Sequence, residues 1–358
     1  MSSTTTTAPV QRVLITGLNG FITPHIAHIF LSNGWIVRGT VRSESKKERV
    51  LSLPLFKPFV EDGKLEIAIV EDFVSSDWSE ALQGVTAVVH AASASVFDQQ
   101  LSADDFIKPA VDGTTRLVQA AAKVETIKAF AYVSSIVAVL NILLPHTAHG
   151  AKTYTEGDWV SFIEEDARKE GAMSHQWYII SKKLAELAAY DAHKSSNAKF
   201  ALSSYCPPAV YGPPEHIASA DELAKIVGTD MSVTQLAKLL TDGEDGVLIP
   251  EFNVVYVDVR DLALAIFKGI HLQAKGRYLI VGETITSQKT VNTARQIRPD
   301  LAKYIVKGQP DVGAEVAEGV YKVDASKSER ELGIKYRTLE DTVRDTISKF
   351  EELGVYQK

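Results

Sequence analysis

The sequence has a single cysteine, Cys206, among its 358 residues. One thiol cannot form an internal disulfide, and it cannot supply the several Cys or His ligands of a structural zinc site. No histidine partner is indicated beside it, so we expect a small buried residue and not a nucleophile. A disulfide scaffold and a zinc-organised fold are therefore excluded. The scarcity of cysteine fits a reducing compartment, and we expect a cytoplasmic location.

Long apolar runs and an excess of basic charge are also missing. No run of about 18 apolar residues occurs, so no membrane partner is expected. The 38 basic and 45 acidic side chains give a formal net charge of −7, whereas nucleic-acid phosphates need clustered basic charge. The opening residues lack the basic segment followed by an apolar segment that is typical of a secretory signal peptide. Residues 1–11, rich in Ser and Thr, are expected to be a disordered leader.

What the sequence does contain is an alternation of short apolar runs and amphipathic stretches, which indicates an α/β fold. The runs are apolar on both faces, as in parallel strands covered by helices on both sides. We expect a Rossmann-type doubly wound sheet over 12–206, then a smaller, mainly substrate-binding lobe over 207–358 with elements that return to the sheet. The expected strands are 13–16, 36–41, 65–70, 87–91, 129–134, 201–205 and 277–281, and the expected helices are 25–32, 46–52, 77–83, 103–123, 174–194, 219–227, 232–241, 260–272 and 338–353, with 141–172 as a loop that has room for one short helix.

A glycine turn follows the first expected strand. Gly17 permits a tight turn, Gly20 lets backbone approach a pyrophosphate, and the next helix offers free N–H groups to that anion. Thr23 stands where the third glycine of this pattern usually lies. We therefore expect the helix to lie slightly farther from the strand and cofactor binding to be weaker or shifted. The expected cofactor contacts in this loop are Gly17, Asn19, Gly20, Phe21 and Ile22.

The end of the second expected strand favours NADP(H) over NAD(H). NAD sites of this fold place an acid there for the ribose 2′-hydroxyl, but this chain has Arg42, with Lys46 close behind. A guanidinium can stack on adenine and pair with a 2′-phosphate. The alternative is that both residues are only a solvated helix start. Further cofactor contacts are expected after the third and fourth strands, at Asp72 (which could instead be only a helix cap), Phe73, Ala91 and Ala92.

Tyr178 and Lys182 stand four residues apart on one face of an expected helix. A neighbouring cation favours tyrosinate and should lower the pKa of Tyr178 from about 10 toward the working pH. Such a pair alone is usually a surface pair, but Ser135 ends the fifth strand at the edge where ligands bind. Together the three could protonate a carbonyl oxygen as a hydride reaches its carbon. After the sixth strand, Pro207 and Pro208 form a rigid segment suited to pressing on a nicotinamide ring.

Weaker signals concern the substrate and a metal. Ser95, Phe97 and Tyr211 are candidate substrate contacts, and each is equally consistent with packing. His146 and His149 could suggest a metal site, but no third ligand is visible, so no metal is expected.

With these residues in place, the chain resembles an extended short-chain dehydrogenase/reductase. Within that family it is similar to the dihydroflavonol reductases and to the microbial carbonyl, aldehyde and methylglyoxal reductases. The resemblance spans most of residues 12–350. Its matching stretches are 16–22, 38–42, 89–93, 133–135, 155–159, 178–182, 207–213 and 257–261.

The resemblance implies a Ser-Tyr-Lys triad. Ser135, the second serine of its pair, would be the catalytic serine, Tyr178 the proton donor, and Lys182 its electrostatic and ribose-binding partner. The resemblance also implies that Arg42 holds the 2′-phosphate and that residues 207–208 flank the nicotinamide.

Two departures from the family pattern stand out. Residues 103–123 contain no Asn, although many short-chain enzymes carry one there, so a proton relay would use water or another group. Leu140 stands five residues after Ser135, and Asn141 lies one place later. The dihydroflavonol reductases use an Asn a few residues past this serine, and the shift argues against a flavonoid substrate.

The expected activity is NADPH-dependent reduction of an aldehyde or ketone by a monomer or homodimer. One alternative is a nucleotide-sugar epimerase or dehydratase, which would need a diphosphate site in the second lobe. Acids outnumber bases over 215–252, which disfavours that site. Another alternative is a regulator that senses NADP(H) without chemistry. Such proteins usually lack the Tyr–Lys pair, and fold alone does not separate these functions.

Overall fold

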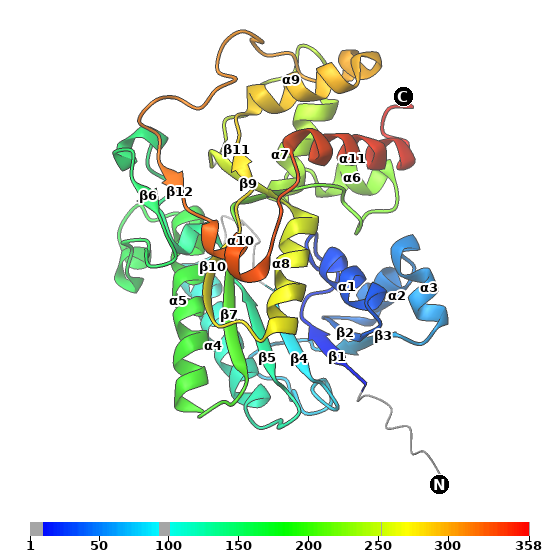
Figure 1. Cartoon of the computed structure of the whole chain (residues 1–358), viewed down its shortest axis with the longest axis vertical. Helices are drawn as coiled ribbons and strands as arrows, with labels where there is room; N and C mark the ends of the chain where they lie inside the picture. The colour runs from blue at the N-terminus through cyan, green and yellow to red at the C-terminus, as the bar shows by residue number, and fades with distance from the viewer. Residues whose placement is uncertain (1–9, 93–100, 252, 358) are drawn as a thin grey trace.

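The structure, a computed structural model, describes residues 10–92, 101–251 and 253–357. Most of the expected leader, together with Ser95 and Phe97, lies outside these residues. The described chain forms a parallel sheet with helices on both sides, and a second lobe lies over one end of that sheet (Figure 1).

The central sheet has seven strands in the order β10-β7-β5-β4-β1-β2-β3, all paired in parallel. The expected doubly wound α/β fold is therefore confirmed. Each expected strand forms within one or two residues of its predicted ends, because a buried parallel strand is apolar on both faces. The strands are β1 Arg12–Ile15, β2 Ile36–Val41, β3 Leu65–Ile69, β4 Ala87–His90, β5 Ala129–Val133, β7 Ala201–Cys206 and β10 Gly276–Leu279.

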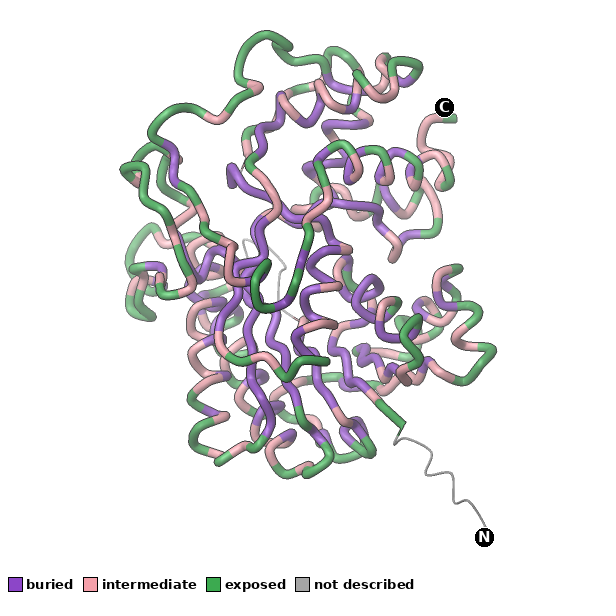
Figure 2. Tube along the Cα trace, in the orientation of Figure 1, coloured by how far each residue is buried: buried purple, intermediate pink, exposed green. Residues whose placement is uncertain are grey.

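Helices cover both faces of this sheet, and β1 shows how. Val13 and Ile15 pack into one apolar cluster with α1 and α8, while Leu14 points to the opposite face and packs with α4 and α5. The buried positions therefore follow the strands through the centre of the molecule (Figure 2). The flanking helices are α1 Thr23–Ser32, α2 Glu44–Leu51, α3 Lys57–Glu61, α4 Ala103–Ala121, α5 Ser174–Ser195 and α8 Val259–Leu272.

The helix expected at 77–83 is wrong, because this segment forms turns. Asp77 Oδ1 accepts hydrogen bonds from the Ser79 backbone N at 3.0 Å and from its hydroxyl at 2.7 Å. Such local bonds compete with a helix. Gly84 then takes a φ of 69°, which ends the segment. Its apolar pattern comes from Trp78 and Leu82, which are buried against the face that α4 and α5 cover.

The second lobe is built around a small three-stranded sheet of order β11-β9-β8. Its helices α6, α7 and α11 lie together in the view of Figure 1. Several of its elements were not expected from the sequence, because they are short or carry many polar residues. The lobe comprises β8 Ala209–Tyr211, α6 Ala220–Ile226, α7 Met231–Thr241, β9 Val255–Asp258, β11 Glu283–Thr284, α9 Ser287–Ile297 and α11 Leu339–Glu352. The helix α10 Ser326–Leu332 instead packs against α8 and β10 of the sheet domain. The strand β6 Thr153–Tyr154, from the 141–172 segment, pairs with β12 Lys322–Val323.

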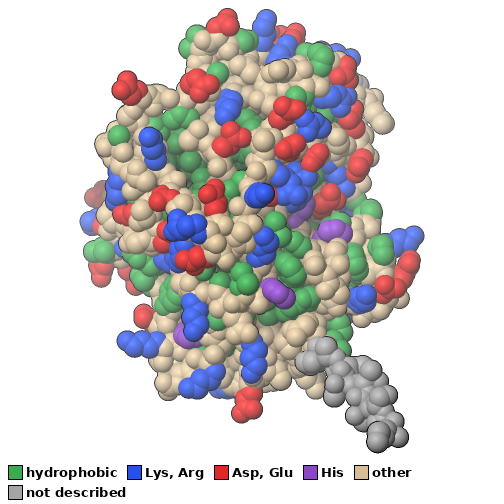
Figure 3. Space-filling view, in the orientation of Figure 1, with side chains coloured by type: hydrophobic (Ala, Val, Ile, Leu, Met, Phe, Trp, Pro, Cys, Tyr) green, Lys and Arg blue, Asp and Glu red, His purple; other side chains and the backbone are tan. Residues whose placement is uncertain are grey.

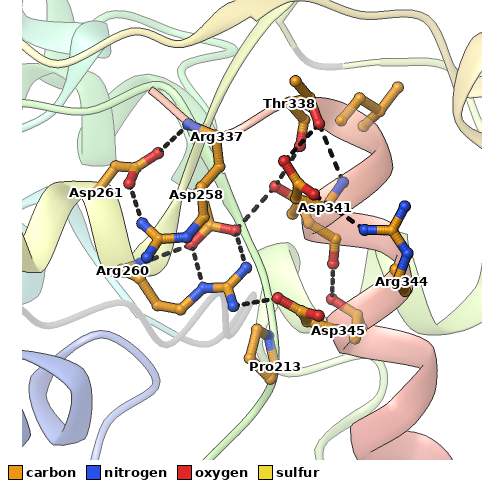
Figure 4. Close-up of polar contacts among 12 residues, drawn as sticks. Pro213, Asp258, Arg260, Asp261, Arg337, Thr338, Asp341, Arg344 and Asp345 are labelled. Carbon is orange, nitrogen blue, oxygen red and sulfur yellow. Dashed lines mark hydrogen bonds and ion pairs between the residues drawn. The ribbon is translucent and has the colours of Figure 1, made fainter. Parts of the chain in front are cut away.

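Charged side chains hold α11 against the start of α8 (Figure 4). Asp258 is the N-cap of α8 and accepts a hydrogen bond from the Arg260 backbone N at 2.8 Å. The Arg260 guanidinium joins Asp258 to Asp345 of α11, and Arg337 pairs with Asp261. We call these five residues the α8–α11 cluster. On the face in Figure 3, acidic and basic side chains are interspersed.

Among the described residues, no helix is both long enough and apolar enough to cross a bilayer.

Candidate active site

A cavity of about 490 Å³ opens at the carboxyl ends of the parallel strands. In an open α/β sheet this edge is where ligands bind. The second lobe supplies the opposite wall through residues 229–232. Most of the predicted site residues line this cavity: Gly17, Asn19, Gly20, Phe21, Ile22, Arg42, Lys46, Phe73, Ala91, Ala92, Ser135, Tyr178, Lys182, Pro207 and Pro208.

The glycine loop has the geometry that close backbone approach requires. Gly17 takes a φ of 73°, and a Cβ built there would lie 3.1 Å from the Ala92 Cβ, so another residue would be strained and crowded. A Cβ on Gly20 would meet its nearest atom at 3.5 Å, an ordinary contact. Thr23, the expected obstacle, is the first residue of α1 and donates a hydrogen bond from Oγ1 to Gly17 O at 2.8 Å. Its side chain therefore helps to hold the turn.

A buried chain of hydrogen bonds fixes the neighbouring strand end. Thr16 Oγ1 accepts from the backbone N of Ala91 and of Ala92, each at 3.0 Å, so its own proton goes to His90 Nδ1 at 2.9 Å. His90 then carries its proton on Nε2 and donates to Thr114 Oγ1 at 3.2 Å. Burial lowers the pKa of His90 to about 3, so the ring is neutral. The turn at Ala91 and Ala92 is thereby held against the glycine loop.

The basic residues in β2 and shortly after it divide into two groups. Arg38, Lys47 and Arg49 each pair with a glutamate: Glu66 at 2.7 Å, Glu44 at 2.8 Å, and Glu222. Arg42 and Lys46 line the cavity. The two cations that could hold a 2′-phosphate are therefore the two that the sequence analysis selected.

The two candidates after β3 separate in the structure. Phe73 lines the cavity. Asp72 is exposed and is not among the lining residues; its Oδ1 accepts from the Val74 backbone N at 2.7 Å, and this hydrogen bond lowers the pKa of Asp72. Asp72 therefore caps the turn at residues 73–75 and not a helix, because the helix expected at 77–83 does not form.

Ser135, Tyr178 and Lys182 all line the cavity. Ser135 lies two residues after the end of β5, and Tyr178 and Lys182 lie one turn apart on α5. The Tyr178 hydroxyl is hydrogen-bonded to the Ser135 side chain. Lys182 Nζ lies 5.9 Å from the centre of the Tyr178 ring and donates to Val133 O at 3.4 Å. Spacing on one helix and the end of one strand thus bring the three together.

The expected lowering of the tyrosine pKa is wrong for the protein alone. Burial raises the pKa of Tyr178 to about 12, although the hydrogen bond with Ser135 opposes the change. Burial also lowers the pKa of Lys182 to about 8. Loss of water disfavours the charged form of each group, and it is the largest cause of both shifts.

A second cluster, which the sequence analysis missed, lies directly behind the triad. Glu186, one turn after Lys182 on α5, is fully buried; it accepts from Ser134 Oγ at 2.6 Å, from Ser204 Oγ at 2.5 Å and from Arg277 Nε at 2.7 Å. Cys206 Sγ lies 3.8 Å from the same carboxylate. We call these five residues the Glu186 cluster. It joins α5 to β5, β7 and β10 at the ends that carry Ser135 and Pro207.

Cys206 is buried, as expected, and burial raises the pKa of its thiol. Tyr211 does not line the main cavity: it is 2% exposed and stacks on Tyr256 with ring centres 5.7 Å apart. Tyr211 is therefore a packing residue and not a lining residue of this cavity.

The histidine pair considered for a metal lies against an aromatic side chain. The ring centres of His149 and Tyr321 are 4.8 Å apart, and the described residues contain no group of three potential metal ligands.

The chain is similar to known proteins over most of its length. A family profile described as Male sterility protein, an NAD-binding family, matches residues 73–258. A putative uncharacterized oxidoreductase of Schizosaccharomyces pombe is 33% identical over 96% of this chain and 97% of its own length. The chain belongs to the extended short-chain dehydrogenase/reductase family.

Two further relatives of this family member have more specific names. A ketoreductase of Aspergillus niger is 30% identical over 96% of this chain and 98% of its own. The crystal structure of Gre2 from Candida albicans in complex with NADPH is 28% identical, covers 96% of this chain and 99% of its own, and superposes with a TM-score of 0.81.

Proposed function

We propose that this protein is an NADPH-dependent reductase that converts an aldehyde or ketone to an alcohol. One observation carries the proposal: Ser135, Tyr178 and Lys182 meet in the cavity that the glycine loop borders. The fit to NADP(H) rests on two observations. A side chain at Gly17 would be strained and crowded against Ala92, and the cations Arg42 and Lys46 line the cavity. Reductases among its relatives support an NADP-dependent oxidoreductase.

The side chains have distinct parts in this reaction. The nicotinamide, when bound, supplies the hydride to the carbonyl carbon. The hydroxyls of Ser135 and Tyr178 donate hydrogen bonds to the carbonyl oxygen, and the Tyr178 proton passes to that oxygen. Because burial raises the pKa of Tyr178 to about 12, the phenol is protonated at neutral pH and ready to donate. The positive charge of Lys182 stabilises the tyrosinate that remains.

The decisive test is Tyr178→Phe, which removes the proton and little else. NADPH absorbance should be followed with a panel of aldehydes, α-dicarbonyls, ketoesters and flavanonols, and NADH run in parallel. We expect kcat to fall by about 10²- to 10⁴-fold while NADPH still binds in a fluorescence titration. Tyr154→Phe is the matched control, because that hydroxyl bonds to His149 at 2.8 Å and does not line the cavity. Near-normal rates in Tyr178→Phe would refute the assignment.

A further inference from the structure

One acidic side chain lies in the wall that faces the triad. Asp230 stands between α6 and α7 and lines the cavity together with Thr229, Met231 and Ser232. Its charge reaches Tyr178, since it is one of the groups that raise the pKa of that phenol. The carboxylate therefore borders the same cavity in which Ser135 and Tyr178 would meet a carbonyl group.

Asp230 also caps a helix, but capping uses only part of the hydrogen-bonding capacity of its carboxylate. It is the N-cap of α7, and its Oδ1 accepts from the Val233 backbone N at 3.0 Å. The Ser232 backbone N bonds to it as well. An ionised carboxylate has about four acceptor positions on its two oxygens. Capacity therefore remains for a ligand in the cavity. Burial raises the pKa of Asp230, and the hydrogen bonds from the Val233 and Ser232 backbone N–H groups oppose that change.

The charges along the cavity are distributed unevenly. Among the described lining residues, the charged side chains are Arg42, Lys46, Lys182 and Asp230. Arg42 and Lys46 follow β2, at the end assigned to the 2′-phosphate, and Lys182 lies behind Tyr178. Within the described part of the second-lobe wall, Asp230 is thus an acid without a base beside it. A substrate carboxylate placed there would meet a like charge in a site of reduced dielectric constant.

We propose that Asp230 determines substrate class: the site takes an uncharged aldehyde or ketone and rejects carbonyl compounds that carry a carboxylate next to the carbonyl, such as 2-oxo acids. This inference rests on the proposed function, because it concerns the substrate of the same site. Like charges placed together at a binding site are an effective means of rejecting a wrong partner.

The test compares two carbonyl compounds that differ chiefly in charge, methyl benzoylformate and benzoylformate. For the unmodified protein, kcat/KM for the ester should exceed that for the acid by about tenfold or more. Asp230→Asn keeps an equally good N-cap and removes the charge. We expect this variant to raise kcat/KM for the acid relative to that for the ester, and so to narrow the ester-to-acid ratio by about tenfold.

Asp242→Asn is the matched control. Asp242 is the C-cap residue of the same helix, is exposed, and does not line the cavity. The ratio should be unaffected in this variant. An ester-to-acid ratio near one in the unmodified protein, a ratio that Asp230→Asn leaves unchanged, or an equal shift in both variants would each overturn the proposal.

A binding measurement separates this inference from the proposed function. Affinities of the ester and the acid for protein saturated with NADP⁺ can be measured by calorimetry, which requires no turnover. The same tenfold preference for the ester, lost in Asp230→Asn, would support the role of Asp230 even if neither compound were reduced. Absence of turnover with the whole carbonyl panel would count against the reductase proposal alone, whereas equal affinities for the two compounds would count against the role of Asp230.

Discussion

The Glu186 cluster and the α8–α11 cluster are built from the same chemistry and have different surroundings. In the Glu186 cluster the ion-paired side chains are 0% exposed for Glu186 and 8% for Arg277. In the α8–α11 cluster Asp258 is 0% exposed, but its partner Arg260 is 24% exposed. Only the Glu186 cluster contacts the strand ends that carry Ser135 and Pro207. From this difference in location we expect the Glu186 cluster to affect both chemistry and stability, and the α8–α11 cluster to affect stability alone.

Breaking the Glu186 cluster should have the largest effect. Glu186→Gln leaves the Arg277 guanidinium buried without its counter-charge, which should lower the free energy of unfolding by about 3–5 kcal/mol in urea titrations. Because Ser134 loses a charged acceptor next to Ser135, kcat should also fall by about tenfold to a hundredfold, with KM for NADPH little changed.

The double variant Glu186→Gln with Arg277→Met sharpens this result. Removing both charges should restore much of the stability, since a buried pair can often be replaced by apolar groups without loss. It should not restore kcat, because Ser134 still lacks its carboxylate acceptor. Recovery of stability and kcat together would show that the cluster affects catalysis only through folding.

Breaking the α8–α11 cluster should have an intermediate effect on stability and none on chemistry. Asp258→Asn preserves the N-cap of α8 and loses the charge that pairs with Arg260. We expect the free energy of unfolding to fall by about 1–3 kcal/mol at pH 7, with kcat unchanged. A lowered kcat at full folding would contradict the separation of the two clusters.

The loss in free energy of unfolding caused by Asp258→Asn should become smaller as the pH falls. Although burial opposes it, hydrogen bonds from Arg260 and its charge lower the pKa of Asp258 below its usual value. A carboxylate with a lowered folded-state pKa stabilises the protein above its unfolded pKa of about 4, and loses that contribution as the pH falls through the folded value. The difference in free energy of unfolding between the unmodified protein and Asp258→Asn should therefore shrink below about pH 4 in urea titrations.

The smallest effect is expected on the outer face of α11. Arg344 pairs there with Glu340 and, at 2.9 Å, with Asp341, and all three side chains are about half exposed (Figure 4). Arg344→Ala should change the free energy of unfolding by no more than about 0.5 kcal/mol, because exposed pairs gain little and are screened. A loss above 1 kcal/mol would place this face in the cluster.

The sequence was sufficient where the signal is local. Continuous apolar runs predict buried parallel strands, and the spacing of Tyr178 and Lys182 places both on one face of α5. It was insufficient where partners are distant: nothing near Glu186 indicates that Arg277 will reach it, and nothing near Asp230 indicates that the loop faces Tyr178. The raised pKa of Tyr178 was missed for a related reason, since loss of water depends on the whole fold.

The place of β10 at the edge of the sheet has a consequence for how the chain is made. Arg277 is separated from Glu186 by 91 residues, most of them in the second lobe. A ribosome releases the N-terminal part first. Until β10 emerges and docks beside β7, the carboxylate behind the triad lacks its Arg277 partner, so we expect the site to be completed only after that step. A chain cut short before β10 would leave Glu186 buried without Arg277, and we expect it to lack catalytic competence even though Ser135, Tyr178 and Lys182 had all been made.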